Sequence, residues 1–188
     1  NQLKTITSFV NEDGETIKDL WNVRCAVEDK EGNIWIGTNV GPLMLQPAKM
    51  NQESPVFQQI KVPRDDGSGY ADYLLNGVDI TGIVIDGANR KWFATNDNGV
   101  YLVSSNNIEE LQHFTAENSP LISNTIESIA INGTTGEVFF GTDKGLCSYK
   151  SNATEAAETM TQESVYAYPN PVKPDYTGPI NITGLSYN

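Results

Sequence analysis

The chain contains few of the residues on which most catalytic sites depend. Its 188 residues include two cysteines, one histidine and three arginines, and twelve Lys and Arg stand against twenty-four Asp and Glu, a net charge of −12. The single histidine, His113, has no second histidine with which to ligate a metal or form a relay. The acidic balance repels phosphate backbones and anionic membrane surfaces. We therefore expect no nucleic-acid partner.

Long apolar runs are also missing. No stretch approaches the roughly 20 residues that a membrane-spanning helix needs, and no basic and apolar leader opens the chain. We expect a soluble fragment of a longer protein from which any export signal has been removed, with no membrane span in this chain.

The two cysteines, Cys25 and Cys147, are far apart in the sequence. Neither belongs to a CxxC motif or a Cys/His cluster. This spacing favours two buried free thiols over a disulfide and gives little information on compartment.

Patterns typical of a catalytic or cofactor site are absent from the sequence. No GxSxG or cysteine-protease signature occurs. Neighbouring carboxylates occur at Glu12-Asp13, Asp65-Asp66 and Glu109-Glu110, all in predicted solvated loops. Glycoside hydrolysis needs two carboxylates that face each other across a cleft, which adjacent loop acids do not establish. We expect no enzyme, no catalytic residues and no cofactor.

One short segment leaves calcium open as an alternative. Asp97 lies between Asn96 and Asn98 and is followed by Gly99, so three side-chain oxygens could ligate the ion. The twelve-residue spacing with a terminal Glu is absent, however, and only one of the three side chains is charged. We therefore predict no metal site, and the sequence names no ligand-binding residues.

What the chain does contain is a threefold repeat. An alternating apolar run is followed by a turn and then by a second strand that ends in an aromatic, two residues and Thr. The runs are Val23 to Val27, Ile80 to Ile85 and Ile126 to Ile131, and the second strands end at Thr38, Thr95 and Thr142. The threonines are 57 (95 − 38) and 47 (142 − 95) residues apart. These periods are typical of one propeller blade per unit.

Each repeat has room for four short strands. A third strand is predicted after the glycine of each repeat, and a looser fourth is suggested at Val56 to Val62 and at Leu111 to Thr115. The fold class predicted is all-β: a fragment of a β-propeller with about three four-stranded antiparallel blades, at about 20–62, 78–115 and 124–150, plus an extended Pro-rich C-terminal tail. Leu3 to Phe9 could be a fourth strand from a preceding blade. Three blades are fewer than the four to eight that close a propeller, so self-association of the open fragment is possible.

The repeated positions are interpreted as structural. The aromatic is expected to form a wedge between neighbouring blades, Thr to tie down the next turn, and Gly to close it. The repeat positions are Trp35, Thr38 and Gly41, then Trp92, Thr95 and Gly99, then Phe139, Thr142 and Gly145.

The C-terminal region has a different composition. Residues 1–150 carry the repeats, residues 151–164 are small, polar and acidic like a linker, and four prolines follow in residues 165–188. Val165 to Tyr168 and Ile180 to Ile182 look like two strands separated by a proline-rich loop. This segment is predicted to be an extended tail or the start of a truncated β-sandwich.

Two stretches resemble known families. Val23 to Gly41 resembles the two-component regulator propeller repeat, which builds periplasmic sensor propellers of hybrid histidine kinases in Bacteroidetes-type bacteria. The turn Asp29-x-x-Gly32-x-x-Trp35 also resembles the aspartate boxes of sialidases, which are a folding device. Phe114 to Tyr149, together with Tyr166 to Pro179, resembles the end of PorZ-like proteins of the type IX secretion system.

The resemblance to PorZ-like proteins covers essentially the whole chain. It implies an extracytoplasmic, non-enzymatic propeller, in the periplasm or at the outer-membrane surface of a Gram-negative bacterium. Such a protein would work by binding protein partners or cell-surface glycan or lipopolysaccharide through its full length. The alternatives are the sensor propeller of a hybrid two-component regulator and, in third place, a propeller lyase or glycosidase.

Overall fold

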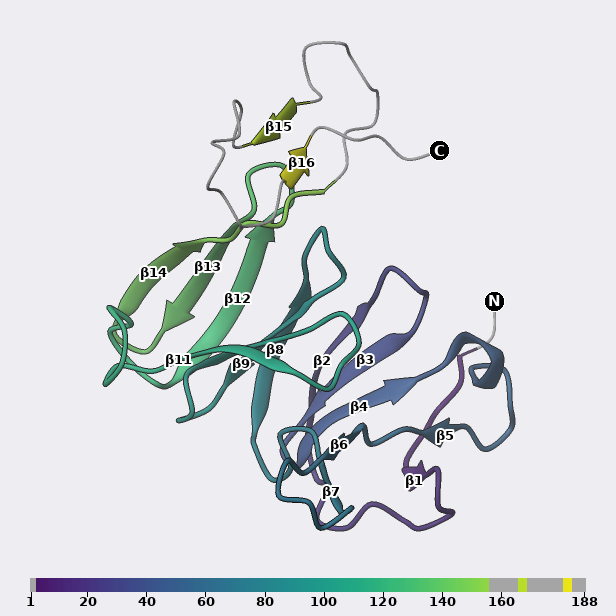
Figure 1. The fold of residues 1–188 in the computed structure, drawn as a ribbon. Coiled ribbons are helices and arrows are strands. Elements are labelled where there is room, and N and C mark those ends of the chain that lie inside the picture. Colours follow the sequence, from purple (N-terminus) through teal and green to yellow (C-terminus); the bar gives the residue numbers. More distant parts are fainter. Residues whose placement is uncertain (1–2, 156–165, 169–180, 184–188) are drawn as a thin grey trace.

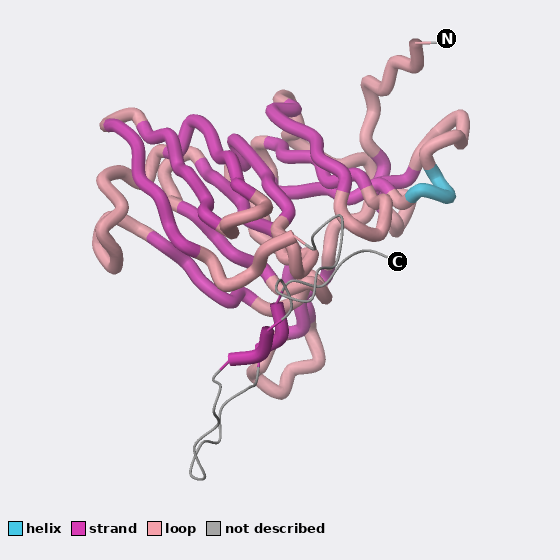
Figure 2. Tube along the Cα trace, turned by 90° about the horizontal axis from the view of Figure 1, so that it is seen from above, coloured by secondary structure: helices cyan, strands magenta, loops and turns pink. Residues whose placement is uncertain are grey.

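Three β-sheets stand side by side like neighbouring blades (Figures 1 and 2). The computed structural model describes residues 3–155, 166–168 and 181–183. Blade 1 contains β2 (Val23–Glu28), β3 (Ile34–Thr38) and β4 (Gly41–Leu45). Blade 2 contains β8 (Ile80–Ile85), β9 (Lys91–Thr95), β10 (Val100–Val103) and β11 (Glu110–Phe114). Blade 3 contains β12 (Ile126–Asn132), β13 (Glu137–Thr142) and β14 (Gly145–Lys150). All neighbouring strands within a blade are antiparallel. The fold class predicted from the sequence is confirmed.

The first strand of each blade lies at the inner edge of its sheet. The strands β2, β8 and β12 are neighbours in space, with β8 in contact with both of the others. Each is followed by a tight turn in which an Asp or Asn accepts hydrogen bonds from the next backbone amides, as Asp29 does from Glu31 and Asn33. Such Asx turns reverse the chain into the second strand. The alternating apolar runs therefore become the inner wall of an open propeller.

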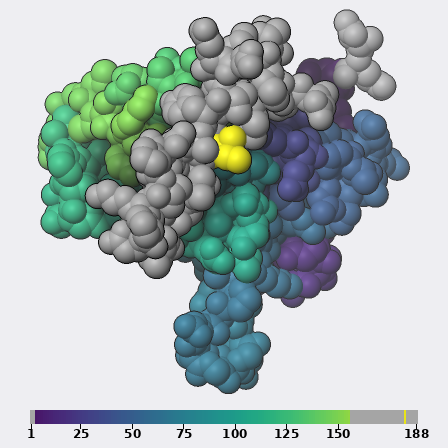
Figure 3. Space-filling view, turned by 45° about the horizontal axis from the view of Figure 1, so that its top comes forward, coloured from purple at the N-terminus to yellow at the C-terminus, as the bar shows by residue number. Residues whose placement is uncertain are grey.

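Only blade 2 has four strands in one sheet within the described residues. In blade 1 the expected fourth strand, Val56 to Val62, is divided into β5 (Val56–Phe57) and β6 (Lys61–Pro63). Gln58 exchanges two backbone hydrogen bonds with Met44, and the chain then leaves the blade. It forms a hairpin of β6 with β7 (Ala71–Tyr73) that projects from the body (Figure 3). Pro63 ends β6, and proline cannot donate to a ladder.

The N-terminal segment covers the outer face of blade 1. The strand expected at residues 3–9 is absent; instead the short strand β1 (Val10–Asn11) pairs in parallel with β5. Ile6, Phe9 and Ile17 pack against a buried cluster that includes Leu43 and Phe57. The segment therefore buries its apolar side chains on the sheet face without pairing as a strand over residues 3–9.

The two repeated tryptophans lie between blades, whereas Phe139 of blade 3 is only partly buried. Trp35 is fully buried in one cluster with Ile80, Ile83 and Phe93 of blade 2. Trp92 is fully buried in a second cluster with Ile126, Val138 and Phe140 of blade 3. We call the interface between two neighbouring blades a seam. Each seam buries the indole of the preceding blade, which supplies much of the apolar area that a single sheet cannot bury alone.

The chain after blade 3 runs across the ends of the inner strands. The backbone amide of Glu155 donates to the carbonyl of Gly133, and the Ser151 hydroxyl accepts a hydrogen bond from Arg90. The strands β15 (Tyr166–Tyr168) and β16 (Asn181–Thr183) pair antiparallel. They overlap the two strands expected at Val165 to Tyr168 and Ile180 to Ile182, whose pairing was not predicted. The rest of the predicted linker, the proline-rich loop and the possible sandwich lie outside the described residues.

Candidate functional site: the mouth of the inner strands

Each inner strand begins with a β-bulge at the same repeat position. The register shifts between Val23 and Cys25, between Ile80 and Gly82, and between Ile126 and Ser128. The residues left unpaired are Arg24, Thr81 and Glu127. A bulge redirects its side chain away from the regular alternation of the strand. The three blades therefore present three different polar side chains from one equivalent position.

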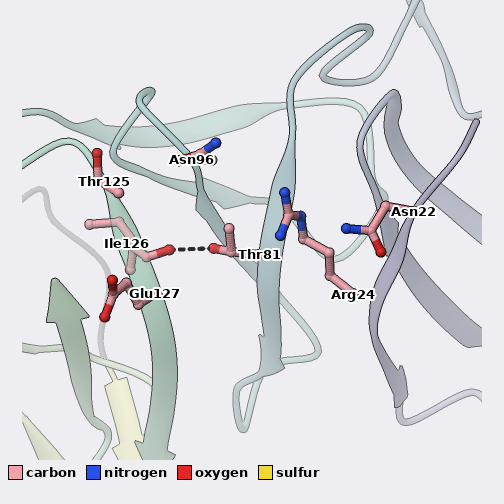
Figure 4. A pocket seen from close by; sticks show the side chains of 7 residues that line it. All are labelled: Asn22, Arg24, Thr81, Asn96, Thr125, Ile126 and Glu127. Atoms are coloured by element: carbon pink, nitrogen blue, oxygen red, sulfur yellow. Dashed lines mark hydrogen bonds between the residues drawn. The ribbon is translucent and has the colours of Figure 1, made fainter. Parts of the chain in front are cut away.

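These three residues line one open pocket of about 560 Å³. The remaining lining residues are Asn22, Asn96, Thr125 and Ile126 (Figure 4). We call this pocket the inner-strand mouth. Its lining is mostly polar and comes from all three blades, so its shape depends on how the blades pack.

The bulge residues connect one blade to the next. The Arg24 guanidinium forms a two-pronged salt bridge with Asp79, with Nε–Oδ1 2.7 Å and Nη2–Oδ2 2.6 Å. This hydrogen-bonded carboxylate raises the pKa of Arg24, although partial burial acts against it. The Thr81 hydroxyl donates to the carbonyl of Ile126 at 2.5 Å. Arg24 and Thr81 thus each bridge to the following blade.

Glu127 is the third member of this series. Its carboxylate points away from Thr81 in Figure 4, and it forms no hydrogen bond or ion pair with the rest of the described chain. Arg24 is already neutralised by Asp79, so Glu127 is the uncompensated charge among the seven described residues that line the mouth. The mouth therefore suits hydrogen bonding to a neutral or positively charged group better than to an anion.

An exposed tryptophan lies beside the mouth. Trp21 is 73% exposed, and its backbone amide, like that of Asn22, donates to the side chain of Asn39. An exposed indole is a common contact surface for a partner. The sequence patterns did not identify it, because Trp21 precedes the alternating run and belongs to no repeat position.

The repeat-position threonines tie down the turns. Thr38 donates to Gly41 O at 2.6 Å, Thr95 to Gly99 O at 2.8 Å, and Thr142 to Gly145 O at 2.9 Å. All three glycines have positive φ. These residues hold the turns beside the mouth and do not line it.

The aspartate of each Asx turn also holds a tryptophan. Trp35 donates from Nε1 to Asp29 at 2.9 Å, and Trp92 donates to Asp86 at 3.3 Å. Phe139, the third aromatic, has no such donor. The aspartates of these two turns therefore hold the side chains of Trp35 and Trp92 in place between the blades.

The other candidate residues lie elsewhere. His113 stacks on Tyr101 with ring centroids 3.8 Å apart and contacts Asn98 O at 2.8 Å. Asp97 accepts from Thr125 at 2.8 Å. No group of three His, Cys, Asp or Glu in the described ranges could hold a metal ion.

Cys25 and Cys147 are free thiols. No described helix is long and apolar enough to cross a membrane.

The fold and the mouth define an open β-propeller assembled from repeated blades. In a comparison with known protein families, residues 18–40 match the family model described as two component regulator propeller. No functionally curated protein matches the chain.

Similar solved structures include the following two. PorZ of Porphyromonas gingivalis, described as an essential bacterial surface component of the type-IX secretion system, has a TM-score of 0.72 and 32% identity; the match covers 95% of this chain and 24% of PorZ. The extracellular domain of a putative hybrid two component system from B. thetaiotaomicron has a TM-score of 0.51 and 21% identity, covering 82% of this chain and 21% of that one. The chain therefore carries the two-component regulator propeller repeat, is similar to PorZ-like propellers, and spans about a quarter of PorZ.

Proposed function

We propose that this chain is part of a non-enzymatic, extracytoplasmic propeller that works by binding, as a PorZ-like component of type IX secretion or cell-surface attachment. The observation that carries the proposal is the 32% identity with PorZ across 95% of the chain. PorZ is a bacterial surface component, so the proposed location is the periplasm or outer-membrane surface of a Gram-negative bacterium. Protein partners, or surface glycan or lipopolysaccharide, would be bound by the full-length protein.

The chemistry of the inner-strand mouth supports binding over catalysis. Glu127 is the one carboxylate among the seven lining residues, whereas a glycosidase of the usual kind needs a pair. Hydroxyl and amide side chains of Thr81, Asn22 and Asn96 suit recognition by hydrogen bonds. The one histidine of the chain stacks on Tyr101 and is not among the described residues that line the mouth, so no Ser–His or Cys–His pair is available there.

A second candidate function is the sensor propeller of a hybrid two-component regulator. The match of residues 18–40 to the two component regulator propeller model favours it. In that case the ligand would be a signal, and the parent gene would encode a membrane-spanning helix and a kinase after residue 188.

A gene deletion separates the two functions. The parent gene is deleted in its native host, and the strain is complemented with the full-length gene or with a variant carrying Trp92→Ala. The attachment function predicts that secreted cargo is released from the cell surface, measured by immunoblotting of cells and medium, with little change in transcripts. The sensor function predicts the reverse, a lost transcriptional response with normal cargo attachment. The Tyr70→Ala variant, altered at a position that is 69% exposed and outside the mouth, serves as the folded control.

A further inference from the structure

A short segment after blade 3 runs across the first turns of all three blades. We call residues 151–155 the strap; it follows β14 directly. The first turn of a blade joins its first strand to its second, at the end of the inner strands that lies opposite the mouth. These turns are residues 29–33, 86–90 and 132–136. The strap therefore lies where one segment can connect the three blades.

Blades 2 and 3 hold the strap by hydrogen bonds. The Ser151 amide donates to the carbonyl of Gly136 at 2.9 Å, and the Glu155 amide donates to that of Gly133 at 2.8 Å. Arg90 of blade 2 donates from Nη2 to the Ser151 hydroxyl at 2.8 Å. Ser151 is only 7% exposed. Both ends of the strap are thus bound to the turn of blade 3, and its start is also bound to blade 2.

Gly87 brings the turn of blade 2 into direct contact with the strap backbone. A Cβ at this position would lie 1.8 Å from the carbonyl oxygen of Thr154 and 2.2 Å from its carbonyl carbon, closer than real Cβ atoms approach. The φ of Gly87 lies outside the left-handed region, so the turn itself does not require glycine here. The close approach of the strap is therefore the reason that position 87 accepts no side chain.

Blade 1 contacts both the strap and the turn of blade 2 through Lys30. Its ammonium lies 3.6 Å from Oε1 of Glu155, and its backbone amide donates to Oδ1 of Asn89 at 3.0 Å. Glu155 also lines a hollow of about 360 Å³ together with residues at the ends of β2, β8 and β12. The ion pair is exposed to water and contributes little. The packing at Gly87 and the backbone hydrogen bonds therefore supply most of the attachment.

We propose that the strap fastens the seams at the end of the inner strands opposite the mouth. At the mouth, Arg24 and Thr81 each bridge to the following blade. The strap supplies the matching connection at the other end, because one backbone segment is bound by blade 3, packed on blade 2 and paired with blade 1. A blade tied at both ends of its inner strand cannot pivot about either end. The chain beyond Glu155 also leaves the propeller from a fixed point.

Hydrogen exchange at the Lys30 amide tests this role, because that amide donates from blade 1 to Asn89 of blade 2. Glu155→Pro removes the backbone donor to Gly133, and Glu155→Ala removes the same carboxylate but keeps that donor. We expect the Ser151 and Lys30 amides to exchange at least about threefold faster in the proline variant than in the alanine variant, because the released strap opens locally. Exchange is measured by NMR on the 188-residue chain.

Gly87→Ala perturbs the same contact from the blade side. Its Cβ pushes the strap away, so the two amides should again exchange faster than in the parent, while amides of β10 keep the parent's rates. Gly67→Ala, in the projecting hairpin with nothing within 4 Å of its Cβ position, should change neither amide. If Gly87→Ala does not fold, the two Glu155 variants decide the matter. A Lys30 amide with equal rates in those two variants, whatever Ser151 does, would overturn the proposal.

Discussion

The ammonium of Lys91 lies 3.8 Å from a carboxylate oxygen of Asp29, across the seam between blades 1 and 2. Both side chains are essentially buried, and the ammonium also sits 5.4 Å from the ring centroid of Trp35. Burial lowers the pKa of Lys91, although the carboxylate of Asp29 acts against that change. In the other two blades Ile34 and Val138 occupy the equivalent position. The seam between blades 1 and 2 therefore contains a charge pair where the seam between blades 2 and 3 has the apolar Val138.

The two residues of this ion pair should differ in how much each contributes to the free energy of unfolding. Asp29 also accepts hydrogen bonds from Trp35 and Asn33, so Asp29→Ala leaves several buried donors unpaired. We expect it to cost about 3–5 kcal/mol of unfolding free energy. Lys91→Met fills the same space without a charge and leaves the buried Asp29 carboxylate held by its hydrogen bonds alone, so we expect a smaller cost of about 1–3 kcal/mol. Urea unfolding measures both, and a larger loss for Lys91→Met would contradict the geometry.

The same aspartate predicts a contribution to acid sensitivity. Burial alone would raise the pKa of Asp29, but hydrogen bonds from Trp35, Asn33 and two backbone amides outweigh it, and the net pKa is lowered from its ordinary 3.8. The unfolded chain therefore binds this proton first as the pH falls, so stability is present above about pH 5 and is lost through the lowered pKa. Asp29→Asn should be less stable at pH 7 and should lose less stability than the parent between about pH 5 and 2. Equal slopes in urea unfolding across that range would contradict the assignment.

Much of the fold could be predicted from the sequence because the repeat encodes it locally. Period-two alternation, Asx turns and Gly at positive φ act within about 20 residues, and these elements formed where they were expected. The fourth strand was harder, since β5 and β6 depend on contacts with β1 and with the hairpin strand β7. Pairing between distant segments leaves little local signal.

The candidate site was less predictable. Arg24, Thr81 and Glu127 become comparable only when the repeats are aligned on their threonines, and nothing local indicates that a bulge redirects them. Lys91 could have been identified from that alignment as a charged residue at an apolar repeat position. The partner residue Asp79 could not, because it lies outside the repeated strands.

Removal of a wedge tryptophan should unfold the chain. Trp92 is fully buried and its ring lies 6.1 Å from that of Phe140 and 5.7 Å from that of Tyr149. Trp92→Ala is expected to cost about 3–5 kcal/mol and to abolish soluble folded protein. Trp21→Ala, at a 73% exposed position, should melt like the parent by circular dichroism. A Trp92→Ala protein with the parent's melting temperature would show that the indole is not a wedge.

Two glycines with positive φ, Gly99 in the repeat and Gly14 outside it, should differ in their tolerance of alanine. Gly99 has φ +71°, and a Cβ there would lie 2.0 Å from the carbonyl oxygen of Phe114. Gly14 has φ +79° but nothing within 4 Å of its Cβ position. Gly14→Ala should therefore cost about 1 kcal/mol from backbone strain alone. Gly99→Ala should cost well above that, because β11 must move away from β10. Thermal unfolding compares the two, and equal losses would refute the close approach.

The salt bridge at the inner-strand mouth should couple the first two blades. Arg24 and Asp79 are 30% and 20% exposed, so water and salt screen their attraction, and we expect a coupling free energy of about 1 kcal/mol. A double-mutant cycle with Arg24→Ala, Asp79→Ala and the double variant, measured by urea unfolding, isolates this value from the loss of each side chain. Asp79 also accepts from Asn96 at 3.3 Å, so Asp79→Ala should be the more costly single change. Because the pair is partly solvated, its coupling should shrink in about 1 M NaCl, where the screening length is about 3 Å. Additive single changes at low salt would mean that the two blades are joined by apolar packing alone.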